Sequence, residues 1–160
     1  MAVFTVGELL DIAVGIEQNG VTYYETLAQL TSDTELETIY TGLANMERHH
    51  IDVFQKMKAG MSGSQAIVPV ESEEEYDTYL RALIDSSVFT DDKVAREMAQ
   101  QVSGPAAALQ LAVGAEKDSI LFYTEMRDLV PAREREAVGN IVREERKHVR
   151  ELSELKQRYA

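Results

Sequence analysis

Two nine-residue stretches decide how this chain folds. Residues 43–51 read LANMERHHI, and residues 141–149 read IVREERKHV. Aligned at an offset of 98 residues, they are identical at three positions: Glu47 with Glu145, Arg48 with Arg146, and His50 with His148. A glutamate and a histidine three residues apart lie on one face of an α-helix. Each stretch therefore predicts a helix that carries a carboxylate and an imidazole on the same face.

A second pair of similar stretches comes before the first. AVGIEQNGVTYYE starts at Ala13 and AVGAEKDSILFYT starts at Ala112, an offset of 99 residues. The repeated positions include two further residue pairs: Glu17 with Glu116, and Tyr24 with Tyr123. The period is too long, and the copies are too few, for a solenoid. We therefore expect two similar helix hairpins related by a pseudo-twofold axis.

The first hairpin is expected over residues 5–58, because apolar residues recur there at helical spacing. A capping box pairs a serine or threonine with an acidic residue three positions later. Two such pairs occur: Thr5 with Glu8, and Ser32 with Glu35. They predict helices of about 5–30 and 33–58.

The second hairpin is expected over residues 105–158. Proline is favoured in the first turn of a helix, so Pro105 and Pro131 predict helices of about 105–129 and 131–158. The crossover, residues 59–104, begins with a glycine- and proline-rich stretch that interrupts helical structure. Two shorter helices are expected after it, one from about residue 72 and one from near Thr90. The prediction is a single all-α domain, residues 1–160: a four-helix bundle with a long crossover.

Four glutamates occupy positions in the bundle where apolar residues belong. Glu17, Glu47, Glu116 and Glu145 each lie within an apolar helical stripe. The first pair lies 15 residues from the turn near residue 32, and the second pair 14.5 residues from the turn after residue 130. At 1.5 Å per residue, all four are roughly 22 Å from their turns. A buried carboxylate is costly unless it is paired or bound to a cation, so we expect a shared cation site.

The ligand pattern indicates two metal ions. One glutamate from each of two helices and Glu-x-x-His from each of the other two is the ligand set of di-metal carboxylate bundles. Four carboxylates balance the charge of two divalent cations, and donors of oxygen and nitrogen suit iron or manganese better than structural zinc. We expect Glu17 and Glu116 as terminal ligands and Glu47 and Glu145 as bridges. His50 and His148 would each cap one metal.

These motifs resemble the rubrerythrin and ferritin-like superfamily over nearly the whole chain. The stretches AVGIEQNGVTYYETL and AVGAEKDSILFYTEM are particularly similar to rubrerythrin. The resemblance implies a ferritin-like bundle and a di-iron centre that reacts with hydrogen peroxide or O2. Dimers are common in that family, so we expect a homodimer.

Two features depart from the rubrerythrin pattern. The chain has no cysteine, so the four-cysteine iron site of a rubredoxin domain cannot form on it and the electron donor would be external. Rubrerythrins usually have an additional carboxylate one helical turn from the terminal glutamate of the third helix. Around Glu116 those positions are occupied by Ala112, Val113, Ser119 and Ile120. The ligand set is instead the symmetric six-residue one of bacterioferritin-type sites.

Other residues near the motifs admit alternative roles. Tyr24 and Tyr123 lie two turns after Glu17 and Glu116, so they are either core aromatics or hydrogen-bond donors to ligand carboxylates. Glu144 competes with Glu145 as a ligand, but the repeat and the spacing both favour Glu145. His49 lies about 100° off the ligand face, and we expect it in solvent.

Composition excludes several functions. There are 28 acidic and 16 basic residues, for a net charge of −12, which argues against nucleic acid and anionic membranes as partners. Glu8, Asp11 and Glu17 occur early and no basic segment precedes them, so no signal peptide is predicted. The expected location is the cytoplasm.

The function expected from these features is that of a redox enzyme, a di-iron peroxidase or ferroxidase in oxidative-stress defence or iron handling. Two alternatives use the same ligands. One is ferritin-type iron storage, which requires assembly into a cage. The other is a non-enzymatic bundle in which the metal only stabilises the fold.

Overall fold

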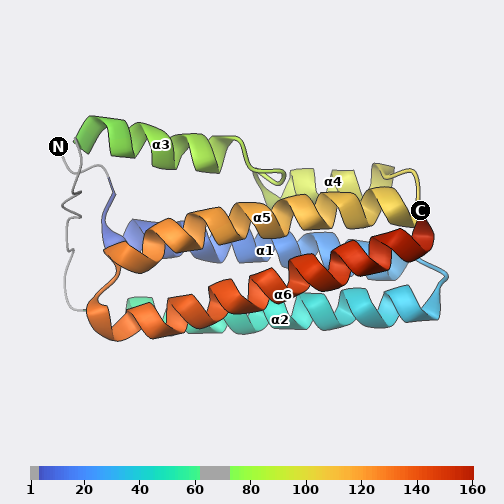
Figure 1. Cartoon of the computed structure of the whole chain (residues 1–160), viewed down its shortest axis with the longest axis horizontal. Helices are drawn as coiled ribbons and strands as arrows, with labels where there is room; N and C mark the ends of the chain where they lie inside the picture. The colour runs from blue at the N-terminus through green and yellow to red at the C-terminus, as the bar shows by residue number, and fades with distance from the viewer. Residues whose placement is uncertain (1–3, 62–72) are drawn as a thin grey trace.

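The long helices form two antiparallel hairpins (Figure 1) in the computed structural model, which describes residues 4–61 and 73–160. The first hairpin contains α1 (Val6–Leu30) and α2 (Thr34–Ala59), and the second contains α5 (Pro105–Leu129) and α6 (Arg135–Tyr159). Helix α1 also runs antiparallel to α5, as Figure 1 shows. The predicted all-α four-helix bundle is confirmed.

The described part of the crossover after α2, residues 73–104, lies along one side of the bundle. Its helices α3 (Glu73–Asp85) and α4 (Asp92–Gln101) pack on α5 and α1 respectively, away from α2 and α6 (Figure 1). Asp118 of α5 accepts a hydrogen bond from the Val88 amide at 2.8 Å, which fixes the segment between α3 and α4. Most of the predicted glycine- and proline-rich stretch, and the expected helix start at residue 72, fall outside the described residues.

Two of the four predicted helix starts differ from the structure. The Thr5–Glu8 capping box opens α1 as predicted. Ser32 does not cap α2, because the carboxylate of Asp33 accepts the amide hydrogens of Glu35 and Leu36 at 2.9 and 3.1 Å. Pro131 does not open α6 either. Its backbone is extended and a 3-10 helix, Ala132–Glu134, follows it, so α6 begins only at Arg135.

A layer of buried polar residues divides the core into two apolar clusters. One cluster contains Leu9, Phe54, Met126 and Ile141. The other contains Leu27, Leu36, Leu109 and Leu152. The predicted ligands lie between these clusters in all four helices. None of the described helices is long and apolar enough to cross a membrane.

Candidate metal centre

The structure brings the six predicted ligands together in the middle of the bundle. Every one of them is buried, with exposed fractions from 0 % to 4 %: Glu17, Glu47, His50, Glu116, Glu145 and His148. In each long helix, apolar segments lie before and after the predicted ligands. Because those segments pack into the two apolar clusters, the ligands between them lie inside the bundle. The hydrophobic effect thus holds in place carboxylates that would otherwise remain in water.

The six side chains form two overlapping groups of possible metal ligands. One group is Glu17, Glu47, His50 and Glu145, and the other is Glu47, Glu116, Glu145 and His148. In each group the ligand atoms lie within 4.8 Å of one another. Glu47 and Glu145 belong to both groups, which is where a bridging carboxylate must be. Glu17 and Glu116 each belong to one group, as terminal ligands do.

Several atoms of this layer that could ligate a metal have no hydrogen-bond partner among the described residues. Glu47 Oε2, His50 Nδ1 and Glu145 Oε1 are all buried and unsatisfied among the described residues. His50 Nδ1 lies 3.0 Å from Glu145 Oε1 and 3.3 Å from Glu47 Oε2. Buried polar atoms normally have partners, and these converge on a common point. Oxygen and nitrogen donors in this arrangement fit a pair of iron or manganese ions.

Without metal, the layer must retain protons. Burial, reinforced by the charges of Glu17 and Glu116, raises the pKa of Glu47 well above its usual value. Burial and the neighbouring carboxylates also raise the pKa of Glu145 to about 8. Burial disfavours the charged form of His148, yet the nearby carboxylates of Glu116 and Glu145 outweigh this and raise its pKa to about 10. Divalent cations would replace these protons.

Two tyrosines contact the two predicted terminal ligands across the bundle. Tyr24 Oη of α1 donates to Glu116 Oε1 of α5, and Tyr123 Oη of α5 donates to Glu17 Oε1 of α1, both at 2.5 Å. The pseudo-twofold axis relates one of these bonds to the other. Each carboxylate is therefore oriented by the opposite hairpin, which is how second-layer hydrogen bonds fix metal ligands.

Glu144 has a role that the sequence did not reveal. Its Oε2 lies 2.7 Å from Nε2 of His50, and its side chain is 40 % exposed. It contacts the back of a predicted ligand and belongs to neither ligand group. The signal available in the sequence was an acidic residue directly before Glu145 on a neighbouring face. His49 is exposed, so it is not part of the centre.

Gly20 makes room for one of the bridging candidates. A Cβ atom at this position would lie 3.3 Å from Cγ of Glu47. The missing side chain therefore lets Glu47 lie against α1. At Gly15, one and a half turns earlier, an added Cβ would meet open space.

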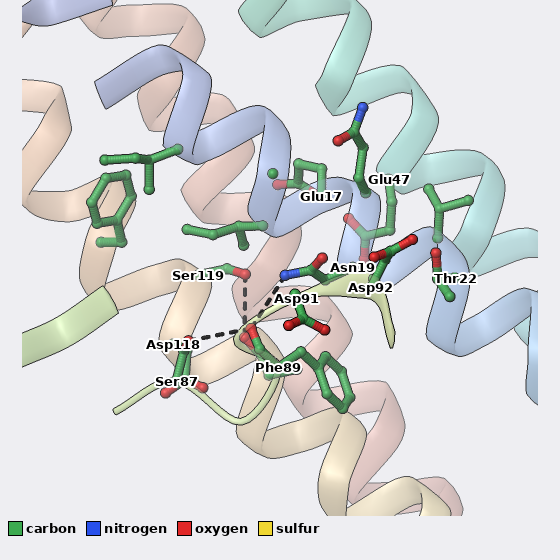
Figure 2. Close-up of a pocket in the computed structure, with 18 of the residues that line it drawn as sticks. Glu17, Asn19, Thr22, Glu47, Ser87, Phe89, Asp91, Asp92, Asp118 and Ser119 are labelled. Carbon is green, nitrogen blue, oxygen red and sulfur yellow. Dashed lines mark hydrogen bonds between the residues drawn. The ribbon is translucent and has the colours of Figure 1, made fainter. Parts of the chain in front are cut away.

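A pocket of about 810 Å³ connects the centre with the surface. Its lining includes the buried Glu17, Glu47 and Glu116 and the exposed Asp91 and Asp92. Figure 2 shows the segment before α4 at this pocket, where Asn19 donates a hydrogen bond to the Phe89 carbonyl at 3.2 Å. A small molecule can thus approach the carboxylates between α1, α5 and the crossover.

Comparison with known proteins agrees with this geometry. A solved structure from Thermotoga maritima, described as a ferritin-like diiron-carboxylate protein, matches with a TM-score of 0.74 and 25 % sequence identity. The match covers 98 % of this chain and 97 % of that one. No curated protein matches the sequence. The rubrerythrin family model matches residues 8–156. The chain therefore belongs to the rubrerythrin family.

Proposed function

We propose that this chain is a di-iron oxidoreductase that oxidises Fe(II) and reduces hydrogen peroxide or O2. The observation that carries the proposal is the pair of overlapping ligand groups, which share Glu47 and Glu145. Two bound iron ions would supply the electrons for reduction of the O–O bond. Peroxide reduction consumes two electrons and two protons and yields two water molecules.

The side chains of this chain support such a reaction in three ways. The four buried carboxylates would neutralise two divalent cations, and the two histidines would complete the ligand set. The hydroxyls of Tyr24 and Tyr123 hold the terminal carboxylates in position. The pocket between α1, α5 and the crossover admits a small oxidant, and the apolar clusters on either side bury the ligand layer. Because the chain has no cysteine for a second iron site, an external donor would return the electrons.

Stopped-flow mixing tests this function. The protein is loaded with two equivalents of Fe(II) without oxygen and then mixed with peroxide or with O2. A rapid rise in near-ultraviolet absorbance is expected with at least one oxidant. Glu47→Gln should abolish it, whereas Glu37→Gln, an exposed glutamate on the same helix, should not. No rapid change with either oxidant would rule out the proposal.

Iron storage requires a closed shell of many chains, so the size of the protein in solution distinguishes it from this proposal. Light scattering should give a small assembly, and we propose a homodimer. A cage of many chains would instead favour storage.

A further inference from the structure

The two histidines of the centre have different surroundings. Nδ1 of His50 faces the carboxylates, and its Nε2 lies 2.7 Å from Glu144 Oε2. Nδ1 of His148 also faces carboxylates, at 2.9 Å from Glu145 Oε2. Among the described residues, however, no carboxylate contacts the other ring nitrogen of His148. Only one of the two imidazoles therefore has an anionic partner behind it.

The internal repeat explains the difference. The offset of 98 residues that aligns His50 with His148 also aligns Met46 with Glu144. Met46 of α2 should therefore occupy the position next to His148 that Glu144 of α6 occupies next to His50. Met46, Glu144 and His148 do line one groove between α2 and α6. A thioether sulfur is only a weak hydrogen-bond acceptor, so methionine cannot replace the carboxylate.

The carboxylate of Glu144 changes His50 as a ligand. By accepting Nε2–H, it fixes the tautomer whose Nδ1 lone pair points at the metal, and its charge makes that nitrogen more basic. Second-layer partners of this kind change metal affinity by roughly 10- to 100-fold. The same support is missing at His148.

We infer that the two metal positions are unequal, and that Glu144 is a positioning residue that makes the position at His50 the tighter one. The inference rests on the proposed di-metal function. It predicts that the position of Glu17 and His50 fills first, and that of Glu116 and His148 second.

Anaerobic titration with Co(II), followed by visible absorbance and calorimetry, tests the order. The natural chain should bind two ions in two steps whose affinities differ by roughly 10- to 100-fold. Glu144→Ala should weaken the first step and bring the two steps together, and Glu144→Gln, which keeps an acceptor without the charge, should fall between. Glu151→Gln, an exposed residue of the same groove, is the control and should leave both steps unchanged.

Two background variants, each with only one metal position left, show which position each binding step fills. His148→Ala leaves the position at His50, and His50→Ala leaves the position at His148. Glu144→Ala should lower Co(II) affinity in the first background and have no effect in the second. Met46→Glu should raise affinity in the second background by supplying the missing carboxylate. The last result requires a gain, which loss of folding cannot imitate.

The outcomes separate this inference from the proposed function. Equal affinities in the natural chain, or an equal effect of Glu144→Ala in both backgrounds, would overturn the inference even if the iron-loaded protein reacts with peroxide. Failure to react with either oxidant would overturn the proposed function and leave the Co(II) result standing.

Discussion

Tyr24 donates a hydrogen bond to Glu116, 92 residues away and on the opposite hairpin, at 2.5 Å. Tyr123 donates the equivalent hydrogen bond to Glu17. Both tyrosines are buried, and their pKa values are raised first by burial and then by the neighbouring carboxylates. The hydroxyls therefore remain protonated donors, and these bonds join the two hairpins through the predicted ligands Glu17 and Glu116.

Removing these hydroxyls should weaken metal binding. Tyr24→Phe or Tyr123→Phe leaves a terminal carboxylate without its donor, so Co(II) affinity should fall by roughly 10-fold or more. Loss of a hydrogen bond to a charged group should also cost about 1.5–3 kcal/mol of unfolding free energy.

The matched control is Tyr23→Phe. Tyr23 is equally buried, but its hydroxyl donates to the backbone carbonyl of Ala108 at 2.7 Å. This variant should lose stability in urea denaturation yet retain metal affinity. Equal affinity losses in all three variants would show that the tyrosines act only through packing.

The stability of the metal-free protein should fall as pH rises. The pKa of Glu145 is raised from 4.5 to about 8, and that of His148 from 6.5 to about 10. The folded state therefore holds protons that the unfolded chain releases between about pH 5 and 9, so the unfolding free energy decreases across that window. Glu116, whose pKa is lowered, acts oppositely and only at acidic pH.

Urea denaturation of metal-free protein from pH 5 to 9 measures this slope. Glu145→Gln should make it shallower. With metal bound the slope should reverse, because metal binding displaces protons and strengthens as pH rises. A metal-free protein that gains stability up to pH 9 would contradict the protonation argument.

The sequence was sufficient for the fold and the ligand candidates because both depend on patterns along single helices. Glu17 and Glu116 interrupt apolar stripes at matching heights, and His50 and His148 follow a glutamate at one fixed spacing. Helix starts were less predictable. Ser32 and Asp33 are both good capping residues, and only the backbone conformation decides that Asp33 caps α2.

The sequence pattern along a single helix does not predict which side chains contact another helix. The bond between Glu144 and His50 joins residues 94 positions apart, whereas the pattern along α6 alone indicates Glu144 only as a competitor of Glu145 for the ligand position. Besides its place directly before Glu145, the sequence offers a second signal for Glu144, which is its mismatch with Met46 in the repeat. The space at Gly20 also depends on where α2 packs on α1, which periodicity does not determine.

Gly20→Ala should disturb the centre, whereas Gly15→Ala should not. The new Cβ at residue 20 would press on Glu47 at 3.3 Å, and the one at residue 15 would enter open space. Alanine is favoured over glycine in a helix by roughly 0.5–1 kcal/mol. Gly15→Ala should therefore raise stability with unchanged Co(II) affinity, and Gly20→Ala should lower affinity. Calorimetric titration and urea denaturation of both variants check this pair, and equal affinities would contradict a role for Gly20.

Glu47→Gln should have opposite effects on the metal-free and metal-loaded proteins. Burial and the charges of Glu17 and Glu116 raise the pKa of Glu47, so at neutral pH the metal-free fold holds a proton on Glu47 that the unfolded chain releases. Glutamine removes the free-energy cost of taking up that proton, so the melting temperature of metal-free protein should rise. The same change removes a shared ligand, so added Fe(II) or Mn(II) should no longer stabilise the fold, although it stabilises the natural chain by mass action. A lower melting temperature without metal would mean that the glutamate is satisfied inside the protein.

Anaerobic loading with ⁵⁷Fe(II), brief exposure to oxidant and Mössbauer spectroscopy test the central claim most directly. If six side chains from four helices hold two metals with shared carboxylates, the spectrum should show two irons per chain as one magnetically coupled pair. Glu145→Gln should lose that coupling. One iron per chain, or two magnetically isolated irons, would contradict a shared centre.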